Sequence, residues 1–228
     1  MARTFNGTSD VIKPSINITL TGIGTSSAWV RPSNTTVGDG AVFGLISGGH
    51  SLTIFAESPG HFAYYDQGGG FTGSATYTIN TWYHVAHVVD GVGAKGYVNG
   101  VADGSLAGLT TLNATTVYWI GYNNQNNFFP GDIADMAVWN TNLTPAEVLA
   151  LAKGARPNML RQGNLIRWWP IDGVQSPEPD LSGNAANGVL TGTTSAFGPP
   201  YMQFTPRWPR FMPLPPPPAF ILMPQIVT

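Results

Sequence analysis

The chain has 228 residues and no cysteine, which excludes disulfides, thiolate nucleophiles and cysteine metal sites. Only 10% of the residues are charged and the net charge is −2, so no basic excess points to nucleic acid or to an anionic membrane surface. Glycine (28 residues) and proline (19 residues) favour short strands and tight turns, because they supply turn dihedrals and interrupt helices.

The first 140 residues predict a series of strands separated by turn clusters. Residues 15–20 alternate, which would place Ile16, Ile18 and Leu20 on one face, and β-branched and aromatic side chains dominate residues 82–89. Further strands are expected at residues 41–46, 51–56, 61–65, 97–100, 117–121 and 133–139. Because no helices alternate with these strands, the pattern indicates an antiparallel sandwich rather than a parallel α/β sheet.

One helix is predicted after the last of these strands. Thr144 and Glu147 have the spacing of a capping box, and Pro145 suits the first helical position. Gly154 would end the helix after Lys153. A single helix of about three turns can pack against a sandwich but cannot form a layer of its own.

The part of the chain beyond this helix divides in two. Residues 165–170 and 189–190 again favour β-structure, with a loop rich in Ser, Gly and Asn between them. The last 30 residues include ten prolines, and their only charged residues are Arg207 and Arg210. We therefore predict a sandwich over residues 1–198 and an extended, proline-rich C-terminal arm over residues 199–228.

Several blocks of the sequence together resemble laminin G-like domains of the concanavalin A-like lectin/glucanase superfamily. They are residues 5–10 (FNGTSD), 80–86 (NTWYHVA), 97–100 (YVNG), 131–140 (GDIADMAVWN) and 143–147 (LTPAE). The resemblance covers residues 5–154 and extends to jelly-roll proteins encoded by bacteriophages. It implies an all-β jelly roll of two antiparallel sheets, but no single activity, because the fold serves lectins, glycosidases, adhesion modules and viral coat components.

One part of the sequence departs from the order in which these blocks usually occur in the family. Residues 168–173 (WWPIDG) and 180–190 look like the segment that usually precedes the opening block, yet here they follow the helix. Segment 155–198 would then either fold back beside the first strand, as in a permuted domain, or be exchanged with a neighbouring copy. We favour folding back because it requires no partner.

The sequence offers no clear pair of catalytic carboxylates. In related glycosidases the acids follow the pattern Glu-x-Asp-x-x-Glu on one strand, where even spacing aims them into a cleft. The nearest match here is Glu178 and Asp180, but Gly183 stands where the second Glu is needed, and the intervening proline is unsuited to a central strand. We therefore expect a protein that is not an enzyme.

Neither the acids nor the histidines have the spacing of a metal site. Asp132 and Asp135 are three residues apart on a predicted strand, as are His84 and His87, so each pair should point to opposite faces. We expect no metal and no cofactor. A calcium ion at Asp90 or Asp132 is the alternative that this fold leaves open.

A loop near residue 125 carries the candidate sugar-binding residues. Aromatic rings can stack on a saccharide and amides can hydrogen-bond its hydroxyl groups. The candidates are Tyr122, Asn123, Asn126 and Phe128. The alternative is a polar loop with one buried aromatic ring.

The C-terminal arm is the second candidate binding element. A segment with few charges and many large apolar groups cannot build a core of its own, whereas prolines reduce the entropy lost when it is ordered on a partner. The aromatic and aliphatic anchors would be Tyr201, Phe204, Trp208, Phe211, Leu214, Phe220 and Leu222. The alternative is a disordered end.

These features favour a non-catalytic structural or binding protein. Our main hypothesis is a virion component, such as a phage capsid decoration on the particle exterior, attached through the arm to other virion proteins. The N-terminus lacks a secretory signal, so an extracellular protein would need another route. Residues 1–152 are net acidic and residues 153–228 net basic, which favours a homo-oligomer. The alternatives are a lectin-type module that binds a surface glycan and, as the weakest, a glycoside hydrolase.

Overall fold

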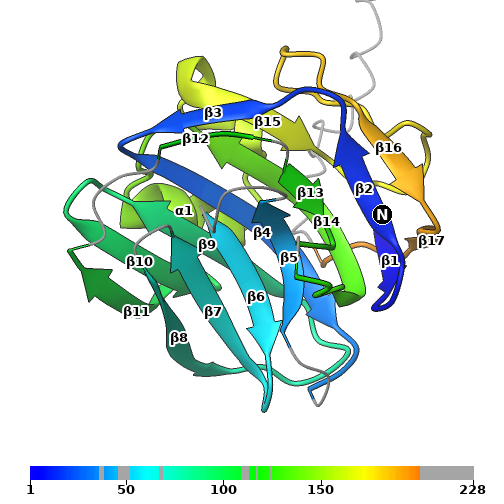
Figure 1. Cartoon of the computed structure of the whole chain (residues 1–228), viewed down its shortest axis with the longest axis horizontal. Helices are drawn as coiled ribbons and strands as arrows, with labels where there is room; N and C mark the ends of the chain where they lie inside the picture. The colour runs from blue at the N-terminus through cyan, green and yellow to red at the C-terminus, as the bar shows by residue number, and fades with distance from the viewer. Residues whose placement is uncertain are drawn as a thin grey trace, which may run out of the picture.

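The computed structural model describes residues 1–35, 39–45, 52–66, 69–108, 113–116, 118–123 and 125–200. These residues form an all-β sandwich of two antiparallel sheets with one short α-helix (Figure 1). The predicted fold class is therefore confirmed.

Two large sheets and one small strand pair make up the sandwich. Sheet A has eight strands, in the order β11 (Val101–Ala107), β10 (Gly93–Val98), β9 (Tyr83–Val89), β4 (Gly24–Pro32), β14 (Pro130–Trp139), β1 (Ala2–Asn6) and β17 (Thr194–Ala196), with β15 (Leu165–Trp169) also paired to β14. Sheet B has seven, in the order β16 (Gly188–Thr191), β2 (Val11–Pro14), β13 (Tyr118–Ile120), β5 (Gly40–Leu45), β6 (Thr53–Glu57), β7 (His61–Asp66) and β8 (Gly69–Thr76). The small pair joins β3 (Ile18–Thr21) to β12 (Asn113–Thr116).

The inner faces of the two sheets enclose the main apolar core. Its largest fully buried side chains include Phe43, Phe62, Tyr64, Tyr118 and Trp169. The Phe43 and Tyr118 rings stack with centroids 4.7 Å apart, across the pairing of β5 with β13. Burial of such large rings supplies most of the driving force for closing the two sheets.

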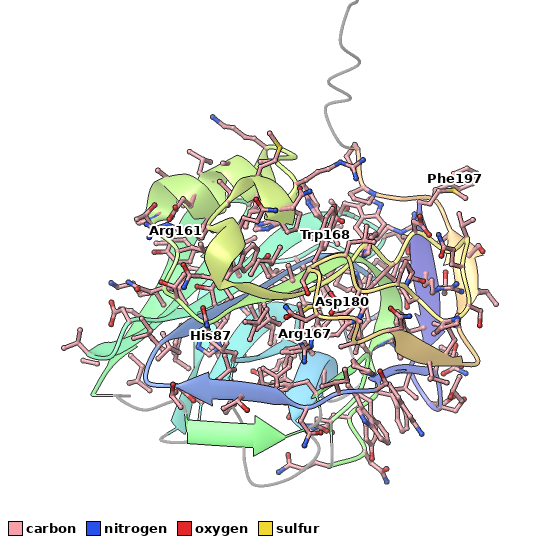
Figure 2. All side chains as sticks on the ribbon, turned by 90° about the horizontal axis from the view of Figure 1, so that it is seen from above. His87, Arg161, Arg167, Trp168, Asp180 and Phe197 are labelled. Atoms are coloured by element: carbon pink, nitrogen blue, oxygen red, sulfur yellow. The ribbon has the colours of Figure 1, made fainter. Side chains whose placement is uncertain are left out.

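The α-helix covers a second, smaller core on the other side of sheet A. Helix α1 (Pro145–Ala152) has the predicted capping box, in which the Glu147 N–H donates to Thr144 Oγ1 and the Thr144 N–H donates to the Glu147 carboxylate. Val148 and Leu151 of α1 pack with Trp139 and other outward side chains of sheet A. Figure 2 shows α1 on the side of sheet A that faces away from sheet B. No helix in the described part of the chain is long and apolar enough to span a membrane.

The sequence analysis missed several strands, among them β1, β2 and the central strand β4, and misplaced Ile16. Strand β4 was not predicted because Thr25, Ser26 and Ser27, all buried, interrupt any apolar pattern. Their hydroxyl groups are accommodated by hydrogen bonds, for example from Ser26 Oγ to the Leu52 carbonyl oxygen at 2.8 Å. The expected alternation of residues 15–20 was wrong at its start: Ile16 precedes β3 and is 46% exposed, whereas Ile18 is buried.

The late segment of the chain extends both sheets of the same chain. Strand β15 pairs with β14, β16 pairs with β2, and β17 pairs with β1. Two short 3-10 helices, Pro157–Met159 and Gln162–Asn164, connect α1 to β15. The buried Asp180 holds the loop between β15 and β16, because its carboxylate accepts the backbone N–H groups of Trp168, Ser182 and Ala186 at 2.9–3.1 Å.

We expect Asp180→Ala to destabilise the protein by about 3 kcal/mol or more, because three backbone donors lose their acceptor in a buried loop. Asp172→Ala is the matched control: within the described chain its carboxylate accepts the exposed Val174 N–H, and the change should cost less than about 1 kcal/mol. Urea unfolding of both variants gives the comparison. Equal losses for the two variants would contradict this role of Asp180.

Strand β9 carries two buried histidines on its opposite faces, as their spacing predicted. His84 contacts the Trp29 ring on the outer side of sheet A, with centroids 5.5 Å apart, and His87 contacts the Tyr64 ring in the main core at 5.7 Å. Burial disfavours the charged imidazolium and lowers the pKa of each histidine from 6.5 to about 3.

The two histidines should make the protein sensitive to acid. Between pH 6.5 and about 3 the unfolded chain binds protons that the folded chain does not, so stability falls as the pH falls through this window. We expect the free energy of unfolding to drop by on the order of 1 kcal/mol per pH unit for each histidine. Urea unfolding between pH 7 and 5 measures this slope, which His84→Phe or His87→Phe should reduce. A slope that neither variant changes would refute the assignment.

Candidate functional site

Three aromatic rings form a continuous, half-buried patch on sheet B. The Tyr122 and Phe128 rings, both predicted as sugar-binding, have centroids 4.5 Å apart. Trp119 of β13 lies beside Tyr122, with centroids 5.2 Å apart. Trp119, Tyr122 and Phe128 are all partly exposed, and we call them the aromatic surface.

Strand alternation directs this surface away from the main core. Tyr118 and Ile120 of β13 are buried in the core between the sheets, so Trp119 points to the outer face of sheet B. Lys13 lies between the buried residues Ile12 and Pro14 on the neighbouring strand β2 and shares that outer face. Its Nζ lies 4.2 Å from the centroid of the Trp119 ring, which is a cation–π contact.

The loop between β13 and β14 packs closely against the backbone of β5, and this contact positions the loop. Gly44 of β5 pairs with Trp119, and a Cβ atom at Gly44 would lie 2.7 Å from Asn123 Cβ and 2.8 Å from the Tyr122 carbonyl oxygen. Only glycine leaves room for the loop at this point. The backbone N–H of Ala41 also donates to the Asn127 carbonyl oxygen at 3.3 Å, which ties the far end of the loop to β5.

The two predicted asparagines have different positions in this loop. Asn123 is fully buried, and its Oδ1 accepts the backbone N–H groups of Gln125 and Asn127 at 3.0 and 3.2 Å. It therefore shapes the loop from within. Asn126 is exposed and lies in the left-handed region (φ 66°), which asparagine tolerates better than most residues.

Sequence reasoning did not single out Trp119 or Lys13. Residues 118–120 are all apolar, so the alternation that marks an outward side chain is absent from the sequence. Lys13 lies in β2, far from Trp119 along the chain, and only the pairing of Ile12 with Ile120 makes the two residues neighbours. No local signal identifies such a pair.

Two acids of sheet B, Asp39 and Glu57, lie just before β5 and at the end of β6. Glu57 ends β6, where its carboxylate accepts a hydrogen bond from Thr72 Oγ1 at 3.1 Å. Partial burial and the negative charge of Asp39 raise the pKa of Glu57 above its ordinary value. Sheet B therefore has a cation beside the aromatic surface on β2 and carboxylates near the start of β5 and the end of β6.

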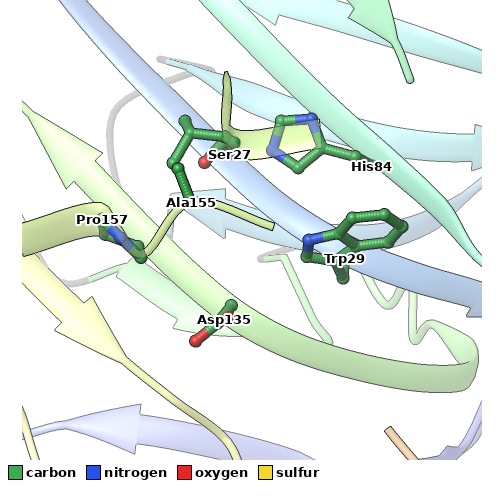
Figure 3. Close-up of a pocket in the computed structure, with 7 residues that line it drawn as sticks. Ser27, Trp29, His84, Asp135, Ala155 and Pro157 are labelled. Atoms are coloured by element: carbon green, nitrogen blue, oxygen red, sulfur yellow. The ribbon is translucent and has the colours of Figure 1, made fainter. Parts of the chain in front are cut away.

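A small hollow lies on the outer side of sheet A, next to helix α1 (Figure 3). It is lined by Ser27, Trp29, His84, Asp135, Leu151, Ala155 and Pro157 and has room for about one water molecule. Ser, His and Asp are the residue types of a hydrolase triad, but Asp135 accepts a hydrogen bond from Trp168 Nε1 at 3.1 Å and lies apart from His84 in Figure 3. Within the described residues His84 Nδ1 has no hydrogen-bond partner, so the relay that a triad needs is not formed.

The acids considered for glycoside hydrolysis serve the fold. Glu178 is fully buried and forms an ion pair with Arg3, with 2.9 Å between Oε2 and Nε. Asp180 binds the three backbone N–H groups described above. Neither carboxylate faces an open cleft among the described residues.

The candidate calcium ligands are likewise occupied. Asp90 accepts N–H groups of its own turn and the ammonium of Lys95 at 2.8 Å, and Asp132 pairs with Arg31 and Thr4. Over the described ranges, no three His, Asp or Glu side chains converge as metal ligands would.

The predicted anchors of the C-terminal arm lie outside the described residues. Tyr201, Phe204, Trp208, Phe211, Leu214, Phe220 and Leu222 form that set. The described chain approaches the arm beside the N-terminus, where Ala196 pairs with Ala2 and Phe197 is 86% exposed (Figure 2).

Sequence comparison connects the chain to a known family. Residues 5–149 match the family model described as the concanavalin A-like lectin/glucanases superfamily. The chain is also 30% identical to C-reactive protein 1.4 of Limulus polyphemus over 105 residues, which make up 40% of this chain and 43% of that protein. It thus spans less than half the length of the curated relatives that it matches.

Solved structures share the same architecture. A candidate carbohydrate-binding protein from Bacteroides ovatus matches 85% of this chain and 59% of its own, with a TM-score of 0.68 and 16% identity. A heptameric SAP-like pentraxin from Limulus polyphemus matches 66% of this chain and 81% of its own, with a TM-score of 0.56 and 18% identity. At these identities the likeness shows the fold alone. The family model, however, covers more than half of the sequence, and the chain therefore belongs to the concanavalin A-like lectin/glucanase superfamily.

Proposed function

We propose that the protein binds carbohydrate through the aromatic surface, without catalysis. The observation that carries this proposal is the contiguous, half-buried arrangement of the Trp119, Tyr122 and Phe128 rings on one face of a sheet. Partly exposed rings held in place by a sheet and a short loop lose little entropy on binding, and their faces suit the C–H surface of a sugar ring.

Polar groups around the rings would supply specificity. Gln125 and Asn126 are exposed and Asn127 is half-buried in the same loop. Their amides can donate to and accept from sugar hydroxyl groups. Asn123 would contribute indirectly, because its two hydrogen bonds keep the loop in shape.

The relatives support binding as the activity. The protein from Bacteroides ovatus is a candidate carbohydrate-binding protein, and the family is one of lectins as well as glucanases. Glu178 and Asp180 argue against a glucanase activity, because the first forms a buried ion pair with Arg3 and the second accepts buried backbone hydrogen bonds. The Limulus pentraxin is a heptamer, and a homo-oligomer of this chain would likewise raise the avidity for a repeating glycan.

We expect Trp119→Ala to weaken binding to a saccharide by about tenfold or more while the fold persists, because loss of one stacking ring removes a partly desolvated contact. Trp82→Ala is the matched control: Trp82 is also half-buried beneath a cation, Arg31 at 5.7 Å, but packs with Trp29 and Ala134 on sheet A. A glycan array followed by calorimetry measures both variants. Equal binding by wild type and Trp119→Ala would rule out the aromatic surface.

A second candidate function rests on the composition of the C-terminal arm. Residues 199–228 contain ten prolines and seven large apolar anchors with only two charges, which suits a segment that lies on another protein. We propose, as the alternative, a structural component of a virus particle, such as a phage capsid decoration on the particle exterior, attached through this arm.

This alternative has its own test. A chain that ends at Pro200 should keep the melting temperature of the sandwich and its glycan binding but lose attachment to the particle. Sedimentation with purified particles, followed by electron microscopy, measures the attachment. Attachment that survives the truncation would count against the arm.

A further inference from the structure

The cation beside the aromatic surface has no counter-ion in the described part of the chain. Four ion pairs form there, and they engage Arg3, Arg31, Lys95 and Arg161. Lys13 is in none of them. Its ammonium is instead held over the Trp119 ring, at 4.2 Å from the centroid.

This contact fixes the position of the charge without neutralising it. The stem of Lys13 is half-buried along sheet B, which limits the freedom of the side chain. The quadrupole of an aromatic ring attracts a cation but does not neutralise its charge, and the N–H donors that point away from the ring can still bind an anionic acceptor. Lys13 is therefore a positioned cation at the rim of the surface where a sugar ring would stack.

The surroundings of Lys13 favour an acidic group at this end of the site. Val189, which pairs with Lys13 from β16, is apolar and 55% exposed, so it offers no competing charge. Two acids lie elsewhere on this sheet: Asp39 just before β5, and Glu57 as the last residue of β6. They would repel an anion there and so favour its placement beside Lys13.

We infer that the site takes an acidic saccharide, with a carboxylate or sulfate group at Lys13 and the adjoining sugar ring on Trp119 and Tyr122. This inference rests on the proposed carbohydrate binding. It adds the chemical class of the ligand and assigns the preference for an acidic saccharide to Lys13.

Matched pairs of saccharides test the inference on the full chain. One pair is an oligogalacturonate and its carboxyl-reduced neutral form, and the other is a sulfated galactan oligosaccharide and its desulfated form. Calorimetry should give an affinity about tenfold higher for an acidic member, and the preference should shrink as salt is raised. The pair with the larger ratio identifies the acidic group.

Substitutions then assign the preference to its residue. Lys13→Gln should bring the ratio between acidic and neutral forms close to one, and Lys13→Arg should retain it. The control is Lys153→Gln, which removes an exposed lysine at the end of α1 and should leave the ratio as in the wild type. Equal affinity of the wild type for both members of each pair, or a preference that persists in Lys13→Gln, would overturn the inference alone. Absence of binding to every saccharide would overturn the proposed function with it.

Discussion

The fold depends on an irregularity in the middle of β14. One edge of β14 pairs with β4, while the other edge pairs first with β1 and then with β15. The register breaks around Asp135, which has a positive φ of 48°. Its backbone N–H donates to the Pro170 carbonyl oxygen at 2.8 Å, and its Oδ1 accepts a hydrogen bond from Trp168 Nε1. A bulge of this kind re-aims a strand, and here it allows one edge to satisfy two partners.

The bulge joins the beginning and the late part of the chain in one sheet. Trp168 and Trp169 of β15 then face opposite ways: Trp168 packs under α1, whereas Trp169 enters the main core and donates from Nε1 to the Ala186 carbonyl oxygen. The ion pair between Arg3 and Glu178 closes the same junction from β1. Buried charges of this type contribute specificity of pairing more than net stability, since their desolvation offsets their attraction.

As a result, the outer faces of the two sheets differ in how much of each is covered by other parts of the chain. Helix α1 and the turn that follows it, including Leu160, cover part of the outer face of sheet A, and the hollow that remains there has room for about one water molecule. The outer face of sheet B instead presents rings that keep part of their surface exposed beside a cation. Half-buried aromatic groups on a rigid sheet are better suited to a ligand than a closed hollow lined by engaged polar groups.

Local features of the sequence determined the sandwich class, the capping box of α1 and the proximity of Tyr122 to Phe128, because each depends on residues close together in the chain. The tertiary structure decided that Asn123 is buried against Gly44 and that Lys13 lies over Trp119. Nor could the sequence find β4, whose buried Thr and Ser side chains hide a central strand. In each case the outcome depends on strand register and on contacts between distant segments, and a one-residue shift of register would turn Lys13 or Trp119 to the other face of the sheet.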